Sequence, residues 1–112
     1  MSLGELDTLL AEDIPGLVVV YDDGAYGAEL HAFRGDPNIG LARLRERDFA
    51  AVFRAMGGQA VTVSTLEDLD GIRPWLAGPS GPMLLHCTVS REVVAPWLRF
   101  AFAGEHDGRA SA

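Results

Sequence analysis

The sequence predicts an α/β protein, a three-layer sandwich built around a parallel sheet. Three short runs of β-branched and aliphatic residues, 17–21, 60–63 and 83–89, indicate strands. Helical periodicity or helix-capping signals stand before and between these runs. Strands that alternate with helices are typical of a parallel sheet with helices on both faces. In such a sheet, any ligand site is expected at the edge where the carboxyl ends of the strands meet.

The first third of the chain begins with leucines at helical spacing in residues 1–11. Ile14-Pro15-Gly16 ends that helix, because proline disfavours helical backbone in the residue before it. The continuous apolar run 17–21 predicts a strand buried on both faces, as in parallel sheets. Asp22-Asp23-Gly24 closes the strand, and residues 25–33 begin either a helix or an ordered loop.

The middle of the chain carries two helix starts. Asp48 caps a helix whose apolar residues share one face and form a core stripe: Phe49, Val52, Phe53 and Met56. Thr65 and Asp68 have the spacing of a capping box and open a helix through about Leu76. The segment 104–112 is small and polar, so we expect a disordered tail after a domain of residues 1–103.

Composition excludes several classes of function. The 112 residues carry a net charge of -7, which argues against nucleic-acid or anionic-membrane binding. All basic residues are arginines, so mechanisms that need a lysine are excluded. The single cysteine, Cys87, cannot form an internal disulfide and favours a reducing compartment. The apolar runs are too short to span a bilayer, and no signal-peptide pattern is visible, so we expect a cytoplasmic protein.

Two carboxylates, Asp22 and Asp23, follow a buried strand and precede a glycine-containing turn. Magnesium is usually held by one or two protein oxygens together with phosphate oxygens and water. The Asp23 carboxylate and a turn carbonyl near Ala25 are candidate ligands of this kind. The two aspartates are explained equally well if they only end the strand and cap the next helix.

Several segments together carry a resemblance to a known family, through their order and spacing: residues 3–8, the strand 18–21, Asp22-Asp23, the turn 24–27, Asp48-Phe49-Ala50, Gly57-Gly58, residues 66–69 and residues 82–87. They resemble the thiamine-diphosphate enzymes of the acetolactate synthase and pyruvate decarboxylase superfamily. The signature of that superfamily runs from Gly-Asp-Gly through a helix and a hydrophobic strand to Asn-Asn and a Gly-Tyr-containing turn. The similarity covers roughly residues 3–96.

The resemblance implies a cofactor, thiamine diphosphate with Mg²⁺, and it assigns roles to six residues. The metal-ligating asparagine of the family falls on Asp23, and its carbonyl ligand falls on Ala25. The other four match positions that support the metal ligand, wrap backbone around the diphosphate or, in the pyruvate decarboxylase branch, supply a catalytic glutamate: Asp22, Tyr26, Gly27 and Glu29. Glu29 is equally explained as a solvated acid in a helix's first turn.

The resemblance also implies that the chain is an N-terminally truncated part of the family's C-terminal cofactor-binding domain. Gly-Asp-Gly is expected a few residues before Met1, and the domain that activates the aminopyrimidine is not in the sequence. We therefore expect a half-site of a 2-oxo-acid decarboxylase or carboligase, incomplete alone. It would work as a homo-oligomer or with a partner chain that carries the pyrimidine-binding domain.

Two other functions are considered. The chain is alternatively a non-catalytic interaction or dimerisation module derived from that domain. A receiver-like magnesium-binding signalling domain would also place paired acids after a buried strand, but it needs a lysine that this chain lacks. His86 and Cys87 occupy adjacent strand positions and therefore face opposite sides, which argues against a Cys-His catalytic pair. Trp75 and Trp97 are expected to serve packing or an interface.

Overall fold

The computed structural model of the protein describes residues 2–98, so the predicted tail 104–112 lies outside it. The described part forms two compact units, residues 2–22 with 46–89 and residues 23–45 with 90–98. Along the chain the elements are α1 (Leu3–Ala11), β1 (Gly16–Asp22), α2 (Gly27–Ala32), η1 (Ile39–Ala42), α3 (Phe49–Ala55), β2 (Gln59–Val63), η2 (Glu67–Ile72), α4 (Arg73–Ala77) and β3 (Pro82–Thr88). Within residues 2–98 no helix is long and apolar enough to cross a membrane.

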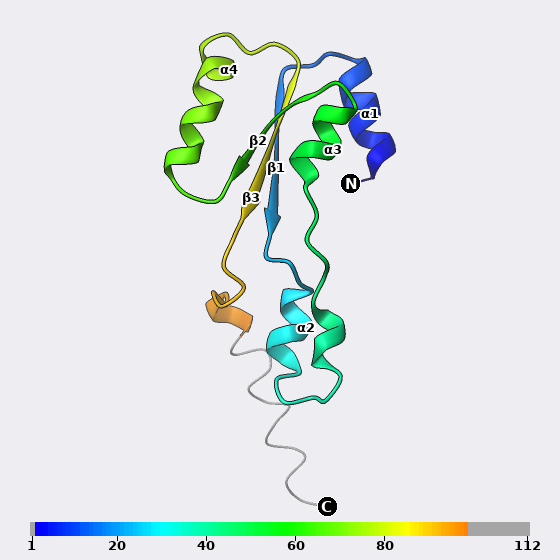
Figure 1. The fold of residues 1–112 in the computed structure, drawn as a ribbon, viewed down its shortest axis with the longest axis vertical. Coiled ribbons are helices and arrows are strands. Elements are labelled where there is room, and N and C mark those ends of the chain that lie inside the picture. Colours follow the sequence, from blue (N-terminus) through cyan, green and yellow to red (C-terminus); the bar gives the residue numbers. More distant parts are fainter. Residues whose placement is uncertain (1, 99–112) are drawn as a thin grey trace, which may run out of the picture. The chain divides into compact units, whose positions relative to one another are not determined.

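The first unit is built on a three-stranded parallel sheet in the order β1-β3-β2. Gly16 pairs with Pro82 at one end of β1, and Asp22 pairs with Thr88 at the other. Helix α4 lies on one side of the sheet, while α1 and α3 lie on the other (Figure 1). The predicted three-layer α/β arrangement with a parallel sheet is therefore confirmed.

Buried side chains fill both sides of the central strand, β3. On the α4 side, a cluster of buried residues joins the sheet to η2 and α4: Val63, Ile72, Trp75, Met83 and Leu85. The indole Nε1 of Trp75 donates a hydrogen bond to the Gly81 carbonyl at 3.1 Å, which satisfies the one polar atom of that ring. The largest fully buried side chains are Phe53 of α3 and Leu84 of β3. The core therefore lies around β3, and Trp75 has a packing role.

The prediction that the first strand is buried on both faces is wrong. Burial alternates along β1, and Leu17, Val19 and Tyr21 are 46%, 40% and 77% exposed. Their register partners on β3 include Met83 and Leu85, so they lie on the sheet face that η2 and α4 cover. Those short helices pack on β2 and β3, and they leave the edge strand β1 uncovered on that face.

The helix predicted from Thr65 to Leu76 is interrupted. It consists of the 3₁₀ segment η2 followed by one turn of α-helix, α4, with Pro74 in the first turn where its missing N–H costs little. The helix after Asp48 is confirmed, since the Asp48 carboxylate accepts a hydrogen bond from the Ala51 amide at 2.8 Å. Its core stripe is narrower than predicted, because Val52 is 42% exposed.

Asp68 closes the loop between β2 and η2. Its carboxylate accepts hydrogen bonds from the amides of Ser64 and Thr65 at 2.9 and 2.8 Å. The bond from Ser64 lowers the pKa of Asp68 most and the bond from Thr65 next, so the pKa lies below its ordinary value of 3.8. A carboxyl group whose pKa is lowered by folding stabilises the fold above its ordinary pKa, and it loses that contribution as the pH falls through the folded-state value.

We therefore expect Asp68→Asn to lower the free energy of unfolding at pH 7, because the neutral amide is a weaker acceptor than the carboxylate. The difference from the wild type should shrink as the pH is lowered below 3.8, where the wild-type carboxyl itself becomes neutral. Urea unfolding at pH 7 and at pH 3 measures both values. A difference of the same size at the two pH values would contradict this account of Asp68.

Candidate functional site

The turn that follows β1 is tied into a small, well-bonded loop of the second unit. One oxygen of the Asp23 carboxylate, Oδ1, accepts a hydrogen bond from the Ala25 amide at 3.0 Å. Two further backbone bonds join the turn to residues 42–44: Leu44 N–H to the Gly24 carbonyl and Tyr26 N–H to the Ala42 carbonyl, both at 2.8 Å. Gly24 adopts a φ of +65°, which glycine reaches without strain. The turn therefore has a defined shape.

Gly27, the first residue of α2, lets the Asp23 carboxylate lie close to the backbone. A Cβ at position 27 would lie 2.5 Å from Asp23 Oδ2, closer than any real contact. A side chain at this position would therefore push the carboxylate away. The glycine and the aspartate belong to one arrangement, in which the carboxylate rests against the start of α2.

The turn presents two oxygens that have no hydrogen-bond donor among residues 2–98, Oδ2 of Asp23 and the carbonyl of Ala25. Both are hard oxygen donors, the kind that Mg²⁺ prefers, and they come from residues two positions apart. The described part of the chain contains no cluster of three or more acidic, histidine or cysteine side chains able to hold a metal. A magnesium ion here would therefore need phosphate or water oxygens to complete its six ligands.

Two further predicted site residues, Tyr26 and Glu29, lie in the same unit. Residues 25–33, predicted as a helix or a loop, contain the helix α2. Tyr26 precedes it with its side chain 57% exposed, and its amide is already bonded to the Ala42 carbonyl. The side chain of Glu29 is exposed in the first turn of α2, where a negative charge is favoured by the helix dipole.

The matches with known proteins concern the segment that holds this turn. The profile of a family described as thiamine pyrophosphate enzyme, C-terminal TPP binding domain, matches residues 1–87, which is most of the chain. The chain belongs to this family. A search of curated proteins finds no match. The predicted membership in the thiamine-diphosphate enzymes is thus confirmed, and the matched part of this TPP-binding domain includes all three strands except Thr88.

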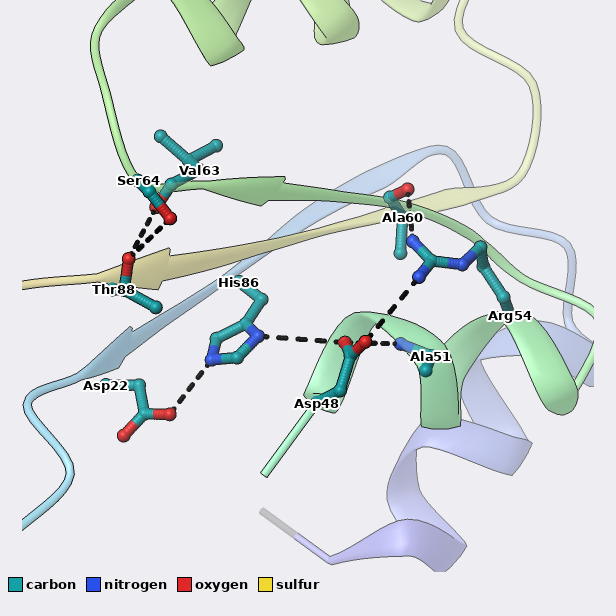
Figure 2. Close-up of polar contacts among 9 residues, drawn as sticks. All are labelled: Asp22, Asp48, Ala51, Arg54, Ala60, Val63, Ser64, His86 and Thr88. Atoms are coloured by element: carbon teal, nitrogen blue, oxygen red, sulfur yellow. Dashed lines mark hydrogen bonds and ion pairs between the residues drawn. The ribbon is translucent and has the colours of Figure 1, made fainter. Parts of the chain in front are cut away.

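Asp22 makes a different set of contacts from Asp23, within the first unit. Its Oδ2 lies 2.9 Å from Nε2 of His86, a residue of the neighbouring strand β3 whose side chain is 4% exposed (Figure 2). A carboxylate only accepts, so Nε2 carries the proton and donates it. The Asp22 carbonyl also accepts a hydrogen bond from Val89 N–H at 2.9 Å. In the TPP-binding domain, the end of β1 is therefore held through both side chain and backbone.

The second ring nitrogen of His86 faces Asp48, the capping residue of α3 (Figure 2). The Nδ1 to Oδ1 distance is 3.9 Å, too long for a hydrogen bond, and Nδ1 is buried with no hydrogen-bond partner among residues 2–98. The Phe49 ring packs edge-on against the imidazole, with ring centroids 5.2 Å apart. The buried imidazole of His86 therefore lies between two carboxylates, from Asp22 and Asp48.

Sequence reasoning did not find this histidine network. It placed His86 and Cys87 on opposite faces of one strand but named no partner for the imidazole. The structure agrees on the faces, because Cys87 packs on the cluster of the α4 side and His86 packs on Phe49 of α3. The sequence offered one signal for this network, which is that both strands carry polar residues near their carboxyl ends. If residues 17–21 and 83–89 pair in parallel, a polar residue near the end of one strand is expected beside a polar residue near the end of the other.

Proposed function

We propose that this domain binds thiamine diphosphate through a divalent cation, Mg²⁺, held by the Asp23 carboxylate and the Ala25 carbonyl. The observation that carries the proposal is the pair of unpartnered oxygens in the turn, with Gly27 leaving room for the carboxylate. When bound, the cofactor supplies a nucleophilic carbon and an electron sink for making or breaking a bond beside a carbonyl group. The role of the protein is to bind and orient the cofactor.

The aspartate at position 23 makes the metal essential to binding. A carboxylate beside a diphosphate places negative charges together, and the chain as a whole already carries a net charge of -7. A divalent cation between them offsets this repulsion and bridges the two groups. We therefore infer that affinity for the cofactor falls steeply when the metal is removed, more so than with a neutral asparagine ligand.

Other residues of the turn are given supporting roles. Gly27 brings backbone close to the diphosphate, since it has no side chain of its own. Asp22, held by His86, keeps the end of β1 in place beside the ligand-bearing residue that follows it in sequence. Tyr26 flanks the diphosphate on the turn. The exposed carboxylate of Glu29 is available to give or accept a proton during the reaction.

The reaction that we propose is decarboxylation of a 2-oxo acid or carboligation starting from one. The aminopyrimidine end of the cofactor needs an activating group from another domain. We infer that a partner chain supplies it. The two reactions use the same diphosphate-binding site, so binding alone does not distinguish them. The proposal for the metal and the proposal for the reaction are therefore tested separately.

Calorimetric titration of the protein with thiamine diphosphate tests the proposed metal-dependent binding. With Mg²⁺ present we expect saturable binding in the micromolar range, about -8 kcal/mol. Removing the metal with a chelator should abolish the heat of binding. Thiamine without its diphosphate is the control ligand and should not bind. No binding of thiamine diphosphate at millimolar concentration with Mg²⁺ present would sink the proposal.

A second function, as a dimerisation module, is favoured by one observation. The β1 face formed by Leu17, Val19 and Tyr21 is apolar, exposed and at the edge of the sheet. A second copy of the chain, placed on this face, would bury it. Sedimentation analysis should then give a dimer that Val19→Glu dissociates, and a wild-type monomer at high concentration would contradict this function.

A further inference from the structure

The second unit contains a pocket lined by three arginines. It has a volume of about 240 Å³, and its walls include Arg34, Arg43 and Arg91. A single carboxylate, that of Glu92, shares the lining. The full chain has sixteen acidic residues and nine basic ones, so a pocket lined by three arginines and one glutamate reverses the charge of the molecule locally.

The charge of these arginines is not neutralised within the described part of the chain. The ion pairs that arginines make among residues 2–98 belong to Arg54 and Arg73, which lie elsewhere. The side chain of Glu92 is exposed and forms no ion pair with the pocket arginines among those residues. An arginine side chain presents five N–H donors in a planar fork, so the pocket holds a surplus of donors and of positive charge.

His31 bonds the side chain of one pocket arginine and the backbone of another. Nη2 of Arg34 donates to Nδ1 of His31 at 2.9 Å, and Nε2 of the same ring donates to the Arg91 carbonyl at 2.9 Å. These bonds fix one tautomer of the ring, with the proton on Nε2. The guanidinium of Arg91 also packs on Gly24, where a Cβ would lie 3.0 Å from Nη2. The Arg34 side chain and the backbone of Arg91 are thus tied to one ring before any ligand arrives, which lowers the entropic cost of binding.

We propose that this pocket binds a small oxyanion, a carboxylate or phosphate group, between Arg34, Arg43 and Arg91. Both anions match the planar fork of arginine, which pairs with them through two parallel hydrogen bonds. Leu30 and Ile39 add an apolar wall for the carbon part of an organic anion. The volume lies below that of sites for whole drug-sized ligands, so the pocket suits one anionic group. The site borders the metal-binding turn proposed above, because Arg91 packs on Gly24, but it shares none of the residues that we assign to the metal.

Titrations with inorganic phosphate and with pyruvate, at low ionic strength and without metal or thiamine diphosphate, test the site. NMR shifts of the arginine side-chain N–H groups report which residues respond. We expect saturable shifts at Arg34 and Arg91, and binding about tenfold weaker in Arg91→Gln, because one charge-assisted hydrogen bond is lost. Arg47→Gln removes the same charge outside the pocket and should change the affinity less than twofold.

The two probes separate the sources of the anion. Binding of phosphate alone assigns the site to phosphate-bearing ligands, and binding of pyruvate, with or without phosphate, assigns it to carboxylates. Arg34→Gln is a second variant, and its side chain is exposed, so it should leave the fold intact. Failure of both anions to saturate, or equal weakening by Arg47→Gln and Arg91→Gln, overturns the proposal whatever the outcome of the cofactor titration.

Discussion

Replacing Asp23 with alanine is expected to weaken Mg²⁺-dependent binding of thiamine diphosphate by about 100-fold or more. The substitution removes one of the two protein oxygens that we assign to the metal. Losing a group that merely supports a metal ligand typically costs 10- to 100-fold in affinity, so losing a ligand itself should reach the upper end or exceed it. Calorimetry with thiamine diphosphate at fixed Mg²⁺, and electron paramagnetic resonance with Mn²⁺ in its place, measure the loss.

Three companion variants show whether the carboxylate acts as a metal ligand. Asp23→Asn keeps an oxygen and removes a charge, so it should bind the cofactor at least as tightly as the wild type. Gly27→Ala introduces a methyl group 2.5 Å from Oδ2 and should weaken binding by displacing the carboxylate. Glu29→Gln changes an exposed side chain away from the metal and should leave binding unchanged. Wild-type affinity in Asp23→Ala would rule out this role.

The positions of the strands could be predicted because each is encoded by its own residues. The runs 17–21, 60–63 and 83–89 correspond to β1, β2 and β3 within one residue at each end. The Asp48 cap is equally local, since its carboxylate bonds an amide only three positions later. The turn after β1 could be predicted as a candidate site for the same reason, because Asp23, Ala25 and Gly27 lie within five residues.

Features that depend on distant segments could not be predicted. The exposure of Leu17, Val19 and Tyr21 follows from the short reach of η2 and α4, which nothing in the apolar run itself reveals. The bond between Asp22 and His86 joins residues 64 positions apart, and its existence depends on the register of β1 with β3. The arginine pocket likewise brings Arg91 beside α2, through a histidine whose partner is 60 positions away.

The second large effect is expected at that histidine. His86→Leu should lower the free energy of unfolding by about 2–4 kcal/mol, because it removes the histidine donor from the Asp22 carboxylate, 20% exposed, and sets an apolar side chain beside that carboxylate. Asp48, 58% exposed, keeps access to water and to the Ala51 amide, so it should contribute little to this loss. Urea unfolding followed by circular dichroism measures the change, at low temperature so that a folded baseline remains for the variant.

A double-mutant cycle separates the lost bond from the lost packing of the ring. His86→Gln keeps an N–H donor that can reach Asp22, so it should recover part of the stability that His86→Leu loses. When Asp22→Ala is added to His86→Leu, the carboxylate that lost its histidine donor is removed as well, and the double variant should be less destabilised than the sum of the two single changes. Strictly additive losses would mean that the Asp22–His86 contact, despite its 2.9 Å length, contributes no coupling, and that His86 acts through its packing on Phe49 alone.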